Sequence, residues 1–527
     1  MSWEDEVEGR NERARRAAAM GGEEAVARHH ERGRLTVRER IDQLADPGSF
    51  HEQGPIAGAS EVSEDGRLVD FSPANYVLGT IEIGGRTCVV GGEDFTQRGG
   101  SPSPAGLRKS VFAEELAWRL RRPLVRFLEG GGGSVRGTAK GGVPRRPAGD
   151  PVYATNRFVS IARILETAPV VSAALGAVAG LPAARLAASH LSIMTRETSQ
   201  VLVAGPALVE RALGERKTKE ELGGSQVHAR SGVVDNVVAD EAEAFELVRR
   251  FLSYLPSNVW EAPPVRPPGA DGAPADDPER SEESLLEIVP RERRRVYAMR
   301  RILRAVVDRD SLLELSPGYG RSQITALARL AGVPVGVVAN DPKIYGGSMD
   351  ADGARKLTRF LNLCETFHLP VLSFVDEPGF MIGSASEQSG TIRWGVDAIC
   401  ATVRSTVPWA VVHVRKAYGV AAAAHFGPEA SVFAWPSAES GALPVEGGVA
   451  VAFRREIEAA PDPDARRAEL EEAFAKGRSP FPRAEAFSVN DLIDPRHTRP
   501  TLCRWLDLVK PRIAEHVAAR RYRDRLA

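Results

Sequence analysis

Two glycine-containing turns, each following an apolar run, are the places where this sequence could do chemistry. They lie in Val371–Gly383 (VLSFVDEPGFMIG) and in Pro408–Ala424 (PWAVVHVRKAYGVAAAA). In each, a run rich in branched and aromatic residues ends in glycine and small residues, which allow backbone N–H groups to approach a ligand closely. Unobstructed N–H groups at a strand-to-helix turn can stabilise an oxyanion without any side chain. The expected chemistry is therefore stabilisation of a developing negative charge by the main chain.

Length and composition limit the partners that we expect. A chain of 527 residues exceeds what one core usually supports, so two domains are expected. With 43% hydrophobic residues, 26% charged residues and a net charge of −1, the sequence gives no electrostatic reason for a nucleic-acid or membrane partner. Cys88, Cys364, Cys400 and Cys503 are far apart, which suits a reducing compartment. A charged N-terminus and the lack of an 18-residue apolar run predict a cytoplasmic protein.

A segment between Pro256 and Glu283 divides the chain nearly in half. It is rich in Pro, Gly, Ala and acidic residues and has little to bury, as is typical of a linker. We therefore expect one domain over residues 1–258, a linker over 259–283 and a second domain over 284–515.

Motifs on the two sides of this linker match one another. RERIDQLADPGSFHEQG and GTIEIGGRTCVVGGEDFTQRGGS correspond to MRRILRAVVDRDSLLELSPG and ITALARLAGVPVGVVANDPKIYGGS. The pairs at an offset of 247 residues are Lys109 with Lys356, Pro123 with Pro370 and Gly132 with Gly379, and those at 239 are Pro169 with Pro408 and Gly180 with Gly419. We infer a tandem duplication of one α/β unit that alternates strands and helices in a right-handed spiral.

The glycine-rich segments do not predict a nucleotide site. GGGGSVRG lacks the G-x-G-x-x-G spacing of dinucleotide-binding turns. The sequence also has no G-x-x-x-x-G-K followed by Ser or Thr, so we do not expect ATP to bind through a P-loop.

Together these motifs resemble a known family. The doubled unit, with LTVRERIDQLADPGSF, GEDFTQRGGS, VANDPKIYGGSMDADGARK, VDEPGFMIG, RKAYG and IDPRHTRPTLCRWL, is similar to the carboxyltransferase β-subunit of biotin-dependent acyl-CoA carboxylases, such as propionyl-CoA and methylcrotonyl-CoA carboxylases. The similarity runs in the family's order over roughly residues 25–515. It implies an α/β protein with two tandem crotonase-like (ClpP/crotonase) β-β-α superhelix domains.

The resemblance also implies a mechanism and a set of site residues. Carboxybiotin supplies CO2, the α-proton of an acyl-CoA is removed, and two backbone oxyanion holes stabilise the enolates, with no metal and no ATP bound by this chain. The implied catalytic positions are Gly132, Gly133 and Ser134 for the thioester, and Gly419, Val420 and Ala421 for the ureido oxygen of biotin. The implied substrate-binding residues are Arg98, Lys109, Gly180, Phe380 and Ala423, with Arg98, Arg108 and Lys109 as candidates for the CoA phosphates.

This sequence departs from the family pattern in two places. The family commonly has Gly-Gly-Ala at both holes, whereas here the first reads Gly-Gly-Ser and the second Gly-Val-Ala. The β-branched Val420 cannot easily adopt a positive φ, so its turn must use an ordinary backbone conformation. Ala423 occupies a position where the propionyl type carries an aspartate, and we hypothesise an acyl group longer or more apolar than propionyl.

Several other side chains have two interpretations. Glu129, Asp376 and Glu377 could act as general acid and base in a hydratase of the same fold, although capping helices or orienting loops is the favoured role. His425 could contact CoA, but packing is favoured. Trp435 and Glu446 are expected to shape the wall on the biotin side of the site, with packing in the core as the alternative.

The chain needs partners to complete a carboxylase. None of its six methionines is followed by lysine, as a biotin-bearing lysine would require, so we expect a separate biotin carboxylase and a biotin carrier protein, on one or two chains. The resemblance implies a homohexamer with sites shared between subunits. Two alternatives remain open, namely a decarboxylase subunit coupled to a membrane ion pump and a non-catalytic structural paralogue.

Overall fold

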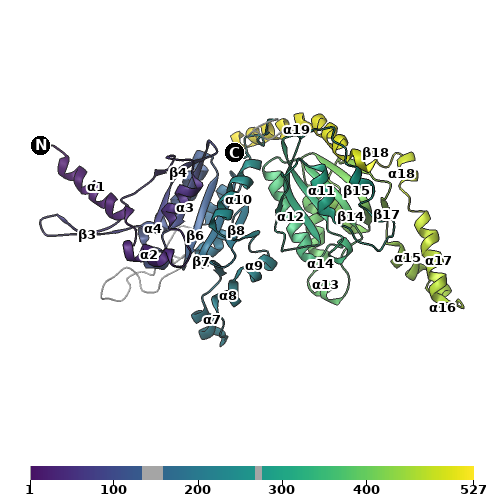
Figure 1. Ribbon diagram of the computed structural model, residues 1–527, viewed down its shortest axis with the longest axis horizontal. Helices are drawn as coiled ribbons and strands as arrows, with labels where there is room; N and C mark the ends of the chain where they lie inside the picture. The colour runs from purple at the N-terminus through teal and green to yellow at the C-terminus, as the bar shows by residue number, and fades with distance from the viewer. Residues whose placement is uncertain (1, 133–157, 268–275, 527) are drawn as a thin grey trace. The chain divides into compact units, whose positions relative to one another are not determined.

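The computed structural model describes residues 2–132, 158–267 and 276–526 (Figure 1). The chain forms two compact units, Met1–Val259 (unit 1) and Trp260–Ala527 (unit 2). Each unit is a mixed α/β structure with its own sheet.

Unit 1 is built around a sheet with the strand order β1-β4-β5-β6-β7-β8-β10, and β9 pairs with β7. The first pairings are antiparallel, and those from β5 to β10 are parallel. The elements of unit 1 are α1 (Glu4–Ala18), α2 (Glu23–His30), α3 (Val37–Leu44), β1 (His51–Glu52), β2 (Gly58–Val62), β3 (Leu68–Pro73), β4 (Tyr76–Ile83), β5 (Arg86–Glu93), η1 (Arg98–Gly100), α4 (Pro104–Leu120), β6 (Leu124–Gly130), α5 (Phe158–Leu165), β7 (Val170–Ala179), α6 (Leu181–Ala187), β8 (Leu191–Thr195), β9 (Gln200–Leu202), α7 (Pro206–Leu213), α8 (Lys219–Gly223), α9 (Ser225–Ser231), β10 (Asn236–Val238) and α10 (Glu241–Tyr254).

Unit 2 repeats this plan with the strand order β11-β12-β13-β14-β15-β16-β18, and β17 pairs with β15. The elements of unit 2 are η3 (Glu283–Leu286), α11 (Met299–Val306), β11 (Leu313–Leu315), β12 (Gln323–Leu330), β13 (Val333–Asn340), η4 (Tyr345–Gly347), α12 (Ala351–Thr366), β14 (Val371–Glu377), α13 (Ser384–Gln388), α14 (Thr391–Val403), β15 (Trp409–Tyr418), η5 (Val420–His425), β16 (Ser431–Ala434), β17 (Glu439–Gly441), α15 (Val445–Ala452), α16 (Arg454–Ala459), α17 (Pro463–Lys476), α18 (Phe481–Glu485), β18 (Asp491–Leu492), η6 (Pro495–His497) and α19 (Thr498–Leu526).

The duplication extends to local detail. The pairing of β6 with β7 shifts register between Leu128 and Gly130, and that of β14 with β15 shifts between Val375 and Glu377, each 247 residues later. The predicted α/β class and tandem repeat are therefore confirmed.

Helix caps and buried strands explain why these elements form. Ser103 caps α4 by accepting a hydrogen bond from the N–H of Gly106 at 3.0 Å, and Asp350 caps α12 by accepting from that of Gly353 at 2.9 Å. Every residue of β6, β12, β13 and β14 is buried, as expected for central strands covered on both faces. The caps and the sheets together position the strand ends where the candidate site lies.

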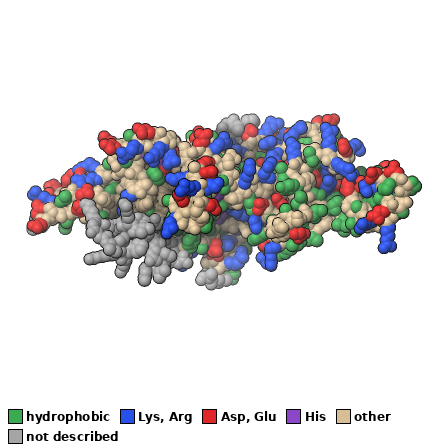
Figure 2. Space-filling view, turned by 90° about the horizontal axis from the view of Figure 1, so that it is seen from below, with side chains coloured by type: hydrophobic (Ala, Val, Ile, Leu, Met, Phe, Trp, Pro, Cys, Tyr) green, Lys and Arg blue, Asp and Glu red, His purple; other side chains and the backbone are tan. Residues whose placement is uncertain are grey.

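The surface carries both signs of charge. Figure 2 shows Lys and Arg side chains mixed with Asp and Glu over the face in view, in keeping with the net charge of −1. No helix in the described part of the chain is both long and apolar enough to cross a membrane.

Candidate active site

In unit 1, two neighbouring parallel strands end in bare backbone segments that meet. After β6 ends at Gly130, the chain continues through Gly131 and Gly132, while β7 leads through Gly180 into α6. The two strands are paired, with Gly130 opposite Val178. A Cβ built on Gly132 would lie 3.0 Å from the Cα of Gly180, so the two segments are in contact without side chains between them.

The Gly180 corner (Gly180–Leu181) has backbone geometry that favours glycine. Gly180 adopts φ 66° and ψ −126°, a region that side chains disfavour. Within the described residues the N–H of Leu181 makes no hydrogen bond, and Pro182 has no N–H to offer. The N–H of Leu181 is therefore unpaired as far as the described residues show. Gly133 and Ser134, which the sequence analysis placed in the first hole, lie outside the described residues.

The Gly419 corner (Gly419–Ala421) is the corresponding turn of unit 2. Gly419 has φ 62°, and its N–H donates to the carbonyl of Gly441 at 3.0 Å. Val420 has no positive φ, as its β-branched side chain requires, and that side chain is 64% exposed, whereas Ala421 is fully buried. In the part of the chain that the structure describes, the N–H groups of Val420 and Ala421 make no hydrogen bond. They are thus available to an acceptor.

The two corners occupy equivalent places. Gly180 follows β7 and precedes α6, and Gly419 follows β15 and precedes η5, with β7 and β15 at the same position in their sheets. Sequence reasoning put the first hole after β6 and assigned no role to Leu181. The offset of 239 residues that pairs Gly180 with Gly419 also pairs Leu181 with Val420, and this was the signal that could have found it.

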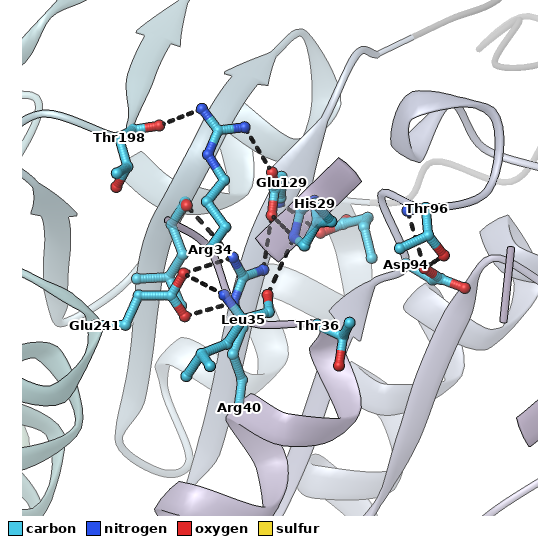
Figure 3. A network of polar contacts seen from close by, with 12 residues as sticks. His29, Arg34, Leu35, Thr36, Arg40, Asp94, Thr96, Glu129, Thr198 and Glu241 are labelled. Carbon is cyan, nitrogen blue, oxygen red and sulfur yellow. Dashed lines mark hydrogen bonds and ion pairs between the residues drawn. The ribbon is translucent and has the colours of Figure 1, made fainter. Parts of the chain in front are cut away.

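A fully buried carboxylate lies just before Gly130 in unit 1 (Figure 3). The Nη1 of Arg34 donates to Oε1 of Glu129 at 3.0 Å, and the Nη1 of Arg40 lies 2.8 Å from Oε2. His29 approaches the same oxygen at 3.5 Å, and burial lowers the pKa of this imidazole. Arg40 also binds the carboxylate of Glu241 through Nε and Nη2, both at 2.8 Å. Glu129 therefore caps no helix but ties the end of β6 to α3 and the segment before it.

In unit 2 one carboxylate joins the ends of three adjacent strands. Oε1 of Glu377 accepts hydrogen bonds from the N–H groups of Gly379 at 3.0 Å and Met349 at 3.3 Å. Oε2 accepts one from the side-chain amide of Asn340 at 2.9 Å and lies 3.3 Å from Nε2 of His425. Burial raises the pKa of Glu377. We call Glu377, Asn340 and His425 the Glu377 cluster. The cluster orients the loops after β13, β14 and β15, which is the role that the sequence analysis favoured for Glu377. His425 is buried within it.

Comparison with known proteins agrees with this geometry. A family model described as the carboxyl transferase domain matches residues 28–523. The chain belongs to this family. The carboxyltransferase subunit of propionyl-CoA carboxylase from Haloferax mediterranei is 33% identical over 516 residues, which is 97% of each chain. The alpha subunit of methylmalonyl-CoA decarboxylase from Veillonella parvula is 31% identical over 510 residues, 96% of each chain.

A solved structure shows the same fold. The crystal structure of the transcarboxylase 12S hexamer with methylmalonyl-coenzyme A bound superposes with a TM-score of 0.84 at 31% identity, and the match covers 97% of this chain and 96% of that one. The crotonase-type fold is thereby confirmed for this carboxyltransferase. Carboxyl transfer from carboxybiotin is the function of the family, so the protein is an enzyme of that class.

The structure separates two residues that were expected to bind CoA. Arg98 is exposed in η1, next to the end of β6, because a Cβ on neighbouring Gly100 would lie 2.3 Å from the carbonyl oxygen of Glu129. Lys109 lines a different cleft of about 1130 Å³, and its ammonium donates to the carbonyl of Gly54 at 3.1 Å. Burial lowers the pKa of Lys109 to about 8. Only Arg98 therefore lies beside the corner segments of the carboxyltransferase.

In unit 2 the remaining predicted residues have different surroundings. Phe380 packs against α14, since a Cβ on Gly395 would lie 2.2 Å from its ring. Ala423 is exposed on η5. Trp435 is fully buried in the hydrophobic core and donates from Nε1 to the hydroxyl of Thr498 at 3.0 Å. The idea that Trp435 shapes the wall of a site is thus wrong, because its indole fills the core instead.

Two more expected residues are held by neighbouring charges and hydrogen bonds. Glu446 lies 3.6 Å from Nε of Arg293. Asp376 is buried and accepts hydrogen bonds from the hydroxyl of Tyr297 at 2.9 Å and from the N–H of Lys416 at 3.1 Å. Burial raises the pKa of Asp376.

Proposed function

We propose that this carboxyltransferase moves a carboxyl group from biotin on a separate carrier protein to the α-carbon, or the vinylogous position, of an acyl-CoA. The N–H groups of the Gly132 segment and of Leu181 hold the thioester oxygen. Those of Val420 and Ala421 hold the ureido oxygen of biotin. The observation that carries this proposal is that both units have, at equivalent corners, N–H groups without a hydrogen bond to any described residue.

The donors suit the charge that develops in this reaction. Cleavage of the N–C bond of carboxybiotin would release CO2 and leave an electron pair on the ureido nitrogen, which would accept the α-proton of the acyl-CoA. The electron pair of that C–H bond would move towards the thioester oxygen, and the α-carbon would then bond to CO2. Fixed N–H groups aimed at that oxygen stabilise it without reorganising, and one such donor is worth roughly 100- to 1000-fold in rate. Free N–H groups at both corners also argue against a purely structural subunit.

The biotin carrier and its carboxylase are separate partners in this proposal. No methionine of this chain precedes a lysine that could carry biotin. The 12S relative, described as a hexamer with methylmalonyl-coenzyme A bound, supports a hexamer and an acyl-CoA substrate here too. Arg98, exposed beside the first corner, would meet the CoA phosphates. All four cysteines are free thiols, as suits a complex in the cytoplasm.

The reverse direction is the second candidate function. The relative from Veillonella parvula is named as a subunit of a methylmalonyl-CoA decarboxylase. The same N–H groups would stabilise the enolate that forms when the carboxyl group leaves. The corners therefore serve both directions, and the partner proteins determine which one operates.

The experiment uses the purified full chain with methylmalonyl-CoA or malonyl-CoA and free biotin as the carboxyl acceptor. We expect loss of the carboxyl group to depend on biotin, and we expect Gly419→Ala to lower kcat at least about 100-fold. Gly447→Ala is the matched control, because a Cβ at Gly447 meets nothing within 4 Å. A rate of carboxyl loss that is the same with and without biotin would contradict the proposal. A monomer in solution that still transfers carboxyl groups would contradict the hexamer.

A further inference from the structure

A small cavity in unit 1 adjoins the first corner segments. Its volume is about 140 Å³, far more than the roughly 10–15 Å³ that one water needs. Gly132 and Leu181, the residues proposed to hold the thioester oxygen, both line it. An acyl group attached to that thioester therefore has the cavity beside it.

The lining of this cavity is mixed, with apolar side chains such as Leu107 and Pro182 beside polar and charged ones. Tyr76 and Glu93 face one another across the antiparallel pair β4 and β5, and both line the cavity with Arg185 of α6. The hydroxyl of Tyr76 makes no hydrogen bond to any described residue. Arg185 is only 3% exposed, and its buried Nη2 has no hydrogen-bond partner among the described residues. Within the part of the chain that the structure describes, the Glu93 carboxylate accepts one hydrogen bond from another residue, from the N–H of Glu129 at 3.3 Å.

The corresponding place in unit 2 is occupied by the protein itself. Gln323 begins β12 as Tyr76 begins β4, and Asn340 ends β13 as Glu93 ends β5. Both amides reach Oε2 of Glu377, Gln323 at 3.4 Å and Asn340 at 2.9 Å. In unit 1 the residue that ends β6, as Glu377 ends β14, is Gly130, which has no side chain. Unit 1 thus lacks, at the end of β6, the carboxylate that binds both amides in unit 2.

The charges around the cavity favour a neutral group over an anion. The carboxylate of Glu114 forms ion pairs with two guanidinium groups, that of Arg185 at 2.8 Å and that of Arg126 at 3.1 Å. Above about pH 7, where Glu93 is ionised, two carboxylates balance two guanidinium groups and leave no net positive charge to bind a further carboxylate. A hydroxyl can donate to Glu93 and accept from Tyr76 or Arg185. A hydrocarbon of the same size would displace water and leave these groups without partners.

We propose that this cavity receives the far end of the acyl group and selects acyl-CoA substrates that are longer than propionyl and carry a terminal hydroxyl. The inference rests on the proposed function, since it requires the thioester to bind at Gly132 and Leu181. The sequence analysis expected an acyl group that is longer or more apolar than propionyl. The inference keeps the greater length but replaces the apolar end with a hydroxyl group.

The test compares two substrates of equal length, 4-hydroxybutyryl-CoA and pentanoyl-CoA, with the reconstituted complex. Sites built to hydrogen-bond a hydroxyl strongly reject analogues that lack it, so we expect kcat/KM to favour the hydroxyacyl substrate at least tenfold. Tyr76→Phe, which removes only the hydroxyl, should bring this ratio at least threefold closer to one. The control is Tyr522→Phe, at a position 66% exposed, which should leave the ratio unchanged.

Each other outcome has a clear meaning. A wild-type enzyme that uses pentanoyl-CoA as well as or better than 4-hydroxybutyryl-CoA overturns the inference, and this result needs no variant to fold. Preference for glutaryl-CoA over both would assign the cavity to an anion and also overturn it. If no acyl-CoA, propionyl-CoA included, is carboxylated in a biotin-dependent way, the proposed function itself fails.

Discussion

Gly132 and Gly180 lie face to face, and neither has room for a side chain. A Cβ on Gly132 would be 3.0 Å from the Cα of Gly180, and a Cβ on Gly180 would be 2.9 Å from the Cα of Gly132. We expect Gly132→Ala and Gly180→Ala each to lower kcat about 100-fold or more, because separating the segments misplaces the N–H donors. Gly205→Ala, where a Cβ meets nothing within 4 Å, is the control. Near-normal kcat in both variants would refute the placement of the first oxyanion site.

The buried Glu129 gives a prediction about stability. Glu129→Ala leaves the guanidinium groups of Arg34 and Arg40 without their shared carboxylate, and removing one partner of a buried pair costs about 3–5 kcal/mol. Urea unfolding of the purified protein measures this loss. Glu458→Ala, which breaks the exposed pair with Arg454, should cost less than about 1 kcal/mol. Equal losses in the two variants would show that the Glu129 pairs do not hold unit 1 together.

The Glu377 cluster links stability to the second corner. In Glu377→Gln, one of the two carboxylate oxygens becomes an NH2 group that faces donors, so at least one buried donor loses its acceptor. We expect a loss of roughly 1–3 kcal/mol per unmatched donor and a fall in biotin-dependent turnover, since His425 ends the helical turn that begins at Val420. Glu429→Gln, at an exposed position, is the control. If turnover is unchanged at a temperature where the variant is fully folded, the Glu377 cluster does not position the Gly419 corner.

The sequence predicted the duplication and much of the corner geometry, because both leave local signals. Constant offsets paired Gly180 with Gly419, and the branched side chain of Val420 required the ordinary backbone that the structure has. The contacts that hold the corners left no such signal. Arg34 and Glu129 are 95 residues apart, and only the folded sheet brings them together. No spacing rule predicts an ion pair of this kind.

The cavity was also beyond prediction from the sequence. Its walls come mainly from β4, β5, α4 and α6, which are far apart in the sequence and meet only in the folded unit. Lys109 shows the converse case. Its match to Lys356 is real, but both ammonium groups donate to backbone carbonyls, of Gly54 and Gln323 respectively. A repeated lysine here reflects repeated structure, and the CoA contact expected of it stays a prediction.

The last prediction concerns pH, because burial raises the pKa of Glu93 from its ordinary value of 4.5 to about 7. Below about pH 4.5 the carboxyl group is protonated in both the folded and the unfolded chain and has no effect. Between about pH 4.5 and 7 the folded chain keeps the proton that the unfolded chain releases, so this group's contribution to stability falls as pH rises and is constant above that window.

Glu93→Gln cannot ionise and escapes this loss. Its free energy of unfolding relative to wild type should therefore rise by up to about 3 kcal/mol between pH 5 and pH 8 in urea titrations. Glu24→Gln, at an exposed position, should show no such trend, and a flat difference for Glu93→Gln would mean that the carboxylate is already ionised in the folded protein at pH 5.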